Sequence, residues 1–117
     1  MKTLVAVPMK DAAASKTRLA AAMSARQRER MALALFQRVQ QFFGTQYPAF
    51  DRLVVTASSR IAALAREGGA AVLIEQGPPG LNSAVRSSFD WARDAGVERL
   101  LIVPADISVW LRSEVDE

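Results

Sequence analysis

Lys10, Lys16 and Arg18 lie close together in the chain, shortly after the apolar run of residues 4–7. Phosphoryl oxygens are held by positive donors that converge on them, a lysine as a point charge and an arginine as a bidentate fork. Ligands of open α/β sheets bind where the strands end. The segment is therefore a candidate phosphate site. An ordinary solvated basic loop is the alternative, and the glycines of a Walker A loop are missing.

Gly80 and Asn82 follow another apolar run, residues 71–74. Glycine lets the backbone approach a ligand closely, and the Asn82 amide could hydrogen-bond a base or a sugar. The alternative is a rigid turn with Asn82 near the cap of the next helix. Taken by itself, this segment favours the turn.

Asp106 follows the last apolar run, residues 100–103. A carboxylate just beyond a buried parallel strand is well placed for Mg²⁺, which binds one or two carboxylates together with substrate phosphates. A turn aspartate or a helix cap explains the residue equally well. Because all three segments follow strands of one sheet, we expect them to project from the same edge and to assemble a nucleotide–Mg²⁺ site there.

Short apolar runs alternate with amphipathic stretches along the chain. We predict strands at residues 3–8, 53–56, 71–74 and 100–103, and helices at 24–43, 60–67 and 81–94. This β-α-β-α-β-α-β order predicts a three-layer α/β/α fold with a mainly parallel, Rossmann-like sheet. We assign residues 1–117 to a single nucleotide-binding α/β domain.

The first helix carries the clearest local signals. Ser24 and Gln27 have the spacing of a capping box, and Gly44 is expected to end the helix. Apolar residues at helical spacing are expected to share one face; these are Met31, Leu35, Val39 and Phe42, with Phe36 and Phe43 beside them.

The chain has 117 residues, a net charge of +3, no cysteine and no histidine. Catalysis would then rest on carboxylates, lysine, arginine, backbone amides and a bound metal. The basic residues are spread out and aromatic residues are few, which favours small anionic ligands and argues against nucleic acid. No apolar run approaches the roughly 20 residues of a membrane span, and no signal-peptide pattern is present. We expect a cytoplasmic protein without a membrane partner.

The three segments resemble the 2-phospho-L-lactate guanylyltransferases and the related phosphoenolpyruvate guanylyltransferases, which are nucleotidyltransferases with a glycosyltransferase-A-like fold. The family opens with a strand, then P-x-K and K-[ST]-R-L, which correspond to residues 8–10 and 16–19. Its G-L-N corresponds to residues 80–82 and its P-A-D to residues 104–106. The resemblance implies transfer of GMP from GTP to the phosphate of a three-carbon acid, 2-phospholactate or phosphoenolpyruvate. Pyrophosphate would leave, and the product would serve deazaflavin coenzyme synthesis.

The resemblance also implies roles for single residues. Pro8, Lys10, Lys16 and Arg18 match the loop that holds the triphosphate, and the three basic residues would stabilise charge at the α-phosphorus during catalysis.

Two further motifs complete the implied site. Gly80 and Asn82 match the nucleotide-side loop, and Asp106 matches the first Mg²⁺-binding aspartate.

The chain departs from the family after the P-A-D motif. Ile107 and Ser108 stand where the family usually has proline and leucine. The family continues for a comparable further stretch, which carries a second metal-binding acid and most of the acceptor pocket. We therefore expect the N-terminal half of the fold, truncated at the C-terminus, with an open sheet edge that favours a homo-oligomer. The alternative function is a non-catalytic α/β module that binds nucleotide or a protein partner.

Overall fold

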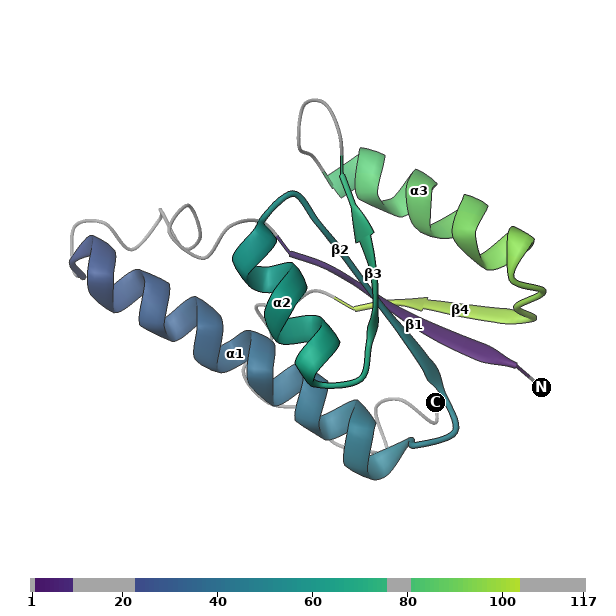
Figure 1. Ribbon diagram of the computed structural model, residues 1–117, viewed down its shortest axis with the longest axis horizontal. Helices are drawn as coiled ribbons and strands as arrows, with labels where there is room; N and C mark the ends of the chain where they lie inside the picture. Colours follow the sequence, from purple (N-terminus) through teal and green to yellow (C-terminus); the bar gives the residue numbers. More distant parts are fainter. Residues whose placement is uncertain (1, 10–22, 76–80, 104–117) are drawn as a thin grey trace.

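The computed structural model describes residues 2–9, 23–75 and 81–103, with backbone alone for residues 81 and 82. In these parts of the chain, strands and helices alternate in the predicted order (Figure 1). The strands are β1 (Thr3–Pro8), β2 (Asp51–Thr56), β3 (Ala71–Ile74) and β4 (Arg99–Ile102). The helices are α1 (Ala25–Gln46), α2 (Ser59–Glu67) and α3 (Leu81–Asp94).

The strands form one parallel sheet in the order β3-β2-β1-β4. Val7 of β1 pairs with Val54 of β2, and Ala6 of β1 pairs with Ile102 of β4. Because the strands all run the same way, their carboxyl ends meet at one edge of the sheet and their amino ends at the opposite edge. We call these the carboxyl edge and the amino edge.

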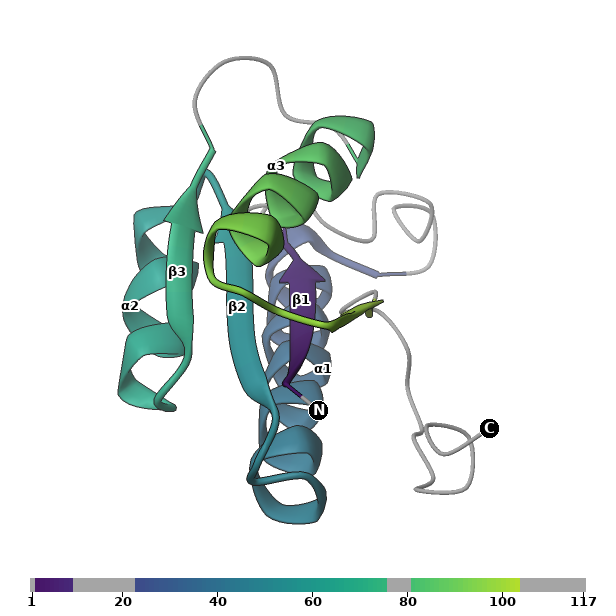
Figure 2. The ribbon, with the colours of Figure 1, turned by 90° about the vertical axis from the view of Figure 1, so that its right-hand side faces the viewer.

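Helices cover both faces of the sheet, with α1 and α2 on one side and α3 on the other (Figure 2). Successive strand residues point to opposite faces. Val5 and Val7 therefore pack in the core under α1 and α2, whereas Leu4 packs in the core under α3. The layers confirm the predicted three-layer α/β/α fold.

The N-terminus of α1 is fixed by the predicted capping box. The Ser24 hydroxyl accepts a hydrogen bond from the Gln27 N–H, and the Gln27 side chain accepts one from the Ser24 N–H at 2.8 Å. The prediction that Gly44 ends this helix is wrong, because α1 continues to Gln46. Tyr47, 7% exposed, donates its N–H to the Phe43 carbonyl. Burial of its ring outweighs the cost of a helical glycine, about 1 kcal/mol.

The buried face of α1 differs from the predicted one. Leu35 and Val39 are buried as expected, but Met31 is 37% exposed and Phe42 is only half-buried. The buried positions of this helix are Ala32, Leu35, Phe36, Val39, Gln40 and Phe43. The helix is therefore rotated so that small Ala32 and polar Gln40 face inward. This rotation depends on packing against other elements, and the spacing of apolar residues alone does not predict it.

The remaining element boundaries agree closely with the sequence-based ones. β1, β3 and α3 have the predicted bounds, β2 begins two residues earlier than predicted, and β4 is shifted by one residue. Glycines follow α2 and α3 as predicted, and Gly69 and Gly96 adopt φ values of 86° and 71°, which favour glycine. Of the described helices, none combines the length and the apolar character needed to cross a bilayer.

Candidate functional site at the carboxyl edge

The strands β1, β3 and β4 come before the predicted motifs, and all three end at the carboxyl edge. Backbone hydrogen bonds extend the ladders past the strand ends, from Met9 N–H to the Val55 carbonyl and from Val103 N–H to the Ala6 carbonyl, each 2.9 Å. On the far side, Glu75 N–H donates to the Thr56 carbonyl at 2.9 Å. The segments after β1, β3 and β4 therefore all depart from the same edge of the sheet.

The structure describes the approach to the predicted site rather than the site itself. Pro8 is half-buried at the end of β1, and the backbone of Asn82 lies in the first turn of α3. The other predicted site residues lie outside the described residues: Lys10, Lys16, Arg18, Gly80 and Asp106. Their convergence on a ligand stays a prediction.

The exit of β2 lies between those of β1 and β3 and leads directly into α2. Thr56 is fully buried, and its hydroxyl accepts a hydrogen bond from the Ser58 N–H at 3.0 Å. The Ser58 hydroxyl accepts in turn from the Ile61 N–H at 3.3 Å and caps α2. These contacts hold the centre of the carboxyl edge in place.

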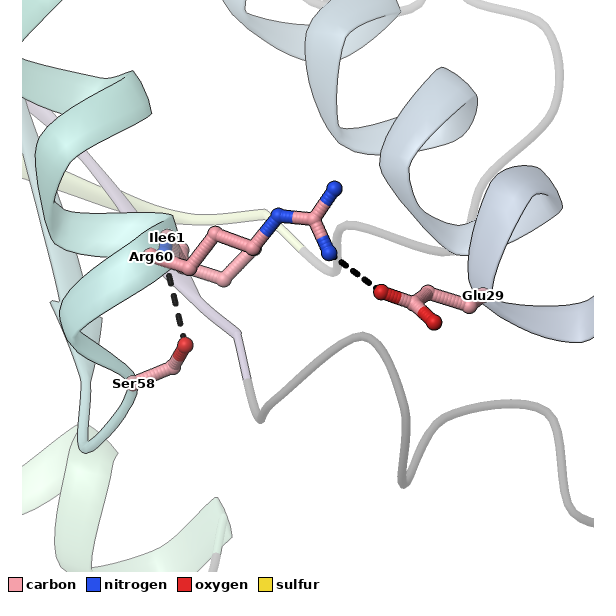
Figure 3. A network of polar contacts seen from close by, with 4 residues as sticks. All are labelled: Glu29, Ser58, Arg60 and Ile61. Atoms are coloured by element: carbon pink, nitrogen blue, oxygen red, sulfur yellow. Dashed lines mark hydrogen bonds and ion pairs between the residues drawn. The ribbon is translucent and has the colours of Figure 1, made fainter. Parts of the chain in front are cut away.

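One ion pair joins the two helices on the same face of the sheet beside this edge. Arg60, in the first turn of α2, donates to the Glu29 carboxylate of α1 (Figure 3). The side chains of Arg60 and Glu29 are 59% and 30% exposed, so the pair is screened by water. It links the beginning of α1 to the beginning of α2 but contributes little stability.

Two buried polar atoms near this edge have no hydrogen-bond partner among residues 2–9, 23–75 and 81–103: Oε2 of Glu75 and Nε of Arg28. Glu75 immediately follows β3, and Arg28 precedes Glu29 on α1. Buried polar atoms in folded proteins are nearly always paired, so both atoms point to missing donors or acceptors. Sequence reasoning gave Glu75 no role. The available signal was its place directly after a buried strand, the same place that drew attention to Asp106.

A metal site can be tested only in part. Over residues 2–9, 23–75 and 81–103, no group of three or more acidic, histidine or cysteine side chains could hold a metal ion. Asp106, the predicted Mg²⁺ ligand, lies outside these ranges. The Mg²⁺ assignment stays a prediction.

The described chain also forms a hollow of about 480 Å³ at the amino edge. Lys2, Asp51, Arg52 and Trp91 are among its lining residues. Asp51 is the first residue of β2 and forms an ion pair with Lys2 at 3.8 Å. Because the motifs follow the opposite ends of the strands, this hollow is separate from the candidate site.

The fold of this chain is similar to that of a solved structure. A crystal structure described as a nucleotide-diphospho-sugar transferase from Desulfovibrio desulfuricans G20 aligns with 99% of this chain and 52% of that chain, with a TM-score of 0.76 and 15% sequence identity. At this identity the likeness shows the fold alone.

The chain belongs to the family described as guanylyl transferase CofC like, whose model matches residues 2–117. The 3-phospho-D-glycerate guanylyltransferase of Colwellia psychrerythraea is 43% identical over 108 residues, which are 92% of this chain and 51% of that relative. The phosphoenolpyruvate guanylyltransferase of Sphaerobacter thermophilus is 29% identical over 116 residues, which are 99% of this chain and 56% of that relative. The chain therefore spans about half the length of the curated relatives that it matches.

Proposed function

We propose that the protein takes part in the transfer of GMP from GTP to the phosphate group of a three-carbon phosphorylated acid. The observation that carries this proposal is the family match over residues 2–117. The two curated relatives bear names that specify 3-phospho-D-glycerate and phosphoenolpyruvate as acceptors. We propose these two acids first and 2-phospholactate, with its deazaflavin pathway, as the third acceptor to test.

The proposed reaction is an in-line displacement at the α-phosphorus of GTP. An oxygen of the acceptor phosphate forms a new bond to this phosphorus, while the bond to the oxygen that bridges the α- and β-phosphorus atoms breaks. Pyrophosphate leaves with that electron pair. The geometry supports this proposal because β1, β3 and β4 leave the sheet at one edge, where a triphosphate could be held across several loops.

The chain would supply positive charge and orientation. Lys10, Lys16 and Arg18 would bind the triphosphate and stabilise the charge that develops at the α-phosphorus. Gly80 and Asn82 would contact the nucleoside side of GTP.

Asp106 is the proposed ligand of Mg²⁺. When bound, this ion would neutralise negative charge on the phosphates.

A second candidate function applies to the 117-residue polypeptide by itself. It corresponds to about half of each relative, 51% and 56%. A non-catalytic α/β module that binds nucleotide or a protein partner would need the carboxyl edge but no acceptor site.

We also propose self-association. In the described sheet the outer edge of β4 has no neighbouring strand, and Phe89 on α3 is 59% exposed. Unpaired edges and exposed apolar side chains favour association. Size-exclusion chromatography with light scattering should give a dimer or larger species, and a monomer at all concentrations would contradict this proposal.

Pyrophosphate release tests the catalytic proposal. The protein is incubated with GTP and Mg²⁺ together with 3-phosphoglycerate, phosphoenolpyruvate or 2-phospholactate, and each acid is omitted in turn. Release that depends on one acid supports transfer and identifies the acceptor. GTP binding without release supports the non-catalytic module, and the absence of both contradicts a nucleotide-dependent function.

A further inference from the structure

Glu75 occupies a fixed place at the carboxyl edge. Its N–H donates to the Thr56 carbonyl at 2.9 Å, so its backbone continues the ladder beyond Ile74. Leu73, two residues earlier, packs in the core under α3. Because strand residues alternate between faces, Glu75 falls on the α3 side of the sheet.

One oxygen of the Glu75 carboxylate lacks a hydrogen-bond partner among the described residues. Its Oε2 is buried, and no donor of the described chain reaches it, whereas the residue as a whole is half-buried. Burying a carboxylate oxygen without hydrogen bonds is costly, because the group loses water and gains nothing in return. A bound molecule that brings N–H or O–H donors would remove this cost.

The strand order places Glu75, which follows β3, at the end of the carboxyl edge farthest from β4. β3 and β4 stand three strand spacings apart in the sheet, about 14 Å. The basic motif follows β1 and the acidic motif follows β4, so Glu75 stands at the far end of the edge. A triphosphate held near β1 and β4 would extend its nucleoside toward β3.

We propose that Glu75 selects guanine by accepting hydrogen bonds from its N1–H and its exocyclic N2 amino group. This inference rests on the proposed function and names the residue that would read the base. Guanine presents two adjacent donors on one edge, which match the two oxygens of a carboxylate in a charge-assisted, bidentate contact. Adenine presents an acceptor at N1, which would face the Glu75 carboxylate and leave it unpaired.

Equilibrium binding of several nucleotides to the full chain tests this assignment. The nucleotides are GTP, inosine triphosphate, xanthosine triphosphate, ATP and 2′-deoxy-GTP. Inosine lacks the N2 amino group, so we expect the wild type to bind GTP about tenfold or more tightly than inosine triphosphate. Glu75→Gln should abolish this preference. It should also improve binding of xanthosine triphosphate, because the glutamine NH₂ group can donate to the xanthine carbonyl at C2.

The matched control is Glu98→Gln, which makes the same change at an exposed residue of the amino edge. It should leave every affinity unchanged, and circular dichroism should show all three proteins folded. A Glu75→Gln variant that keeps the GTP preference overturns the assignment. Equal loss of GTP, inosine triphosphate and ATP, with 2′-deoxy-GTP unaffected, would place Glu75 on the ribose and also overturn it. A wild type that binds none of the nucleotides overturns the proposed function itself, an outcome distinct from the other two.

Discussion

Charged side chains at the two edges of the sheet differ in their hydrogen bonds and ion pairs. At the amino edge, the Lys2 ammonium group donates to the Ala95 carbonyl at 2.9 Å and pairs with Asp51. Arg52 donates to the Gly68 carbonyl at 2.6 Å and to the Gln40 carbonyl at 3.3 Å. Arg52 thereby joins β2 to α1 and to the end of α2. The described basic side chains of this edge serve the fold.

At the carboxyl edge, the described chain leaves charged atoms unpaired. Oε2 of Glu75 and Nε of Arg28 are buried without partners, and the basic motif of residues 10–18 begins one residue after Met9. At the amino edge the charged groups of Lys2 and Arg52 are bonded within the fold. At the carboxyl edge Arg28 donates through Nη1 to the Met23 carbonyl at 3.4 Å, while its Nε has no partner among the described residues. Unsatisfied charged groups at the edge that carries the predicted motifs are expected where a ligand binds, because the ligand supplies the missing partners. Toward the amino edge the unpaired group is instead the neutral amide of Gln40.

The largest expected effect comes from a pair of lysines at opposite edges. Lys16→Ala should weaken GTP binding by about 1.5–3 kcal/mol, the usual contribution of a hydrogen bond to a charged group. Lys2→Ala makes the same change at the amino edge and should leave GTP affinity unchanged. Isothermal titration calorimetry with GTP and Mg²⁺ measures both. Equal affinities of the two variants would remove the functional difference between the edges.

Arg52→Ala should show the opposite pattern. The change removes two hydrogen bonds that join α1 and α2 to β2, and partial exposure limits the loss to about 1–2 kcal/mol of unfolding free energy. GTP affinity should stay the same. Urea denaturation measures the stability, and Arg86→Ala on the exposed side of α3 is the control, with a change below about 0.5 kcal/mol. A loss of GTP affinity in Arg52→Ala would connect the amino edge to the site.

The sequence predicts the order and bounds of the strands and helices better than the packing around single residues. Apolar runs and turn residues located β1, β3 and α3 at their observed bounds, because buried strands and capped helices leave strong local patterns. The prediction that Gly44 ends α1 was wrong because the helix continues to Gln46, and Tyr47, three residues after Gly44, is buried in the core. The Gly44 position also adjoins the guanidinium of Arg52, where an added Cβ would lie 3.7 Å from its Nη1. That contact arises only when the chain is folded.

The sequence also indicates some residues of the candidate site and not others. The positions after β1 and β4 could be proposed because strands of a parallel sheet deliver their following residues to one edge, and their role in a site stays a prediction. Glu75 could not be singled out, because its distinguishing property is a buried oxygen without a partner. Burial and hydrogen bonding depend on neighbours from other elements, which the linear sequence does not bring together.

Gln40 provides a smaller test at the amino edge. Its side chain is 8% exposed, and both polar atoms of its amide lack hydrogen bonds among the described residues. Because an unpaired buried amide is costly, Gln40→Met should raise the unfolding free energy by about 1 kcal/mol. Gln41→Met, at the exposed neighbouring position, should change it by less than about 0.5 kcal/mol. Destabilisation by Gln40→Met, measured in urea, would show that the amide has a structural role. The amino edge would then also contain a polar group that the described hydrogen bonds do not account for.

The smallest effect is expected for the ion pair that joins the helices beside the carboxyl edge. Arg60 and Glu29 are 59% and 30% exposed, so their attraction is screened and ordering both side chains costs entropy. A double-mutant cycle of Arg60→Ala and Glu29→Ala, measured by urea denaturation, should give a coupling energy of about 0.5 kcal/mol. The coupling should fall further in 1 M NaCl, where charges are screened over about 3 Å. A coupling energy above about 1 kcal/mol that does not change with salt would mean that the Arg60–Glu29 pair stabilises the carboxyl edge about as strongly as Arg52 stabilises the amino edge. The unpaired atoms of the carboxyl edge could then no longer be explained by weaker packing of that edge in the absence of a ligand.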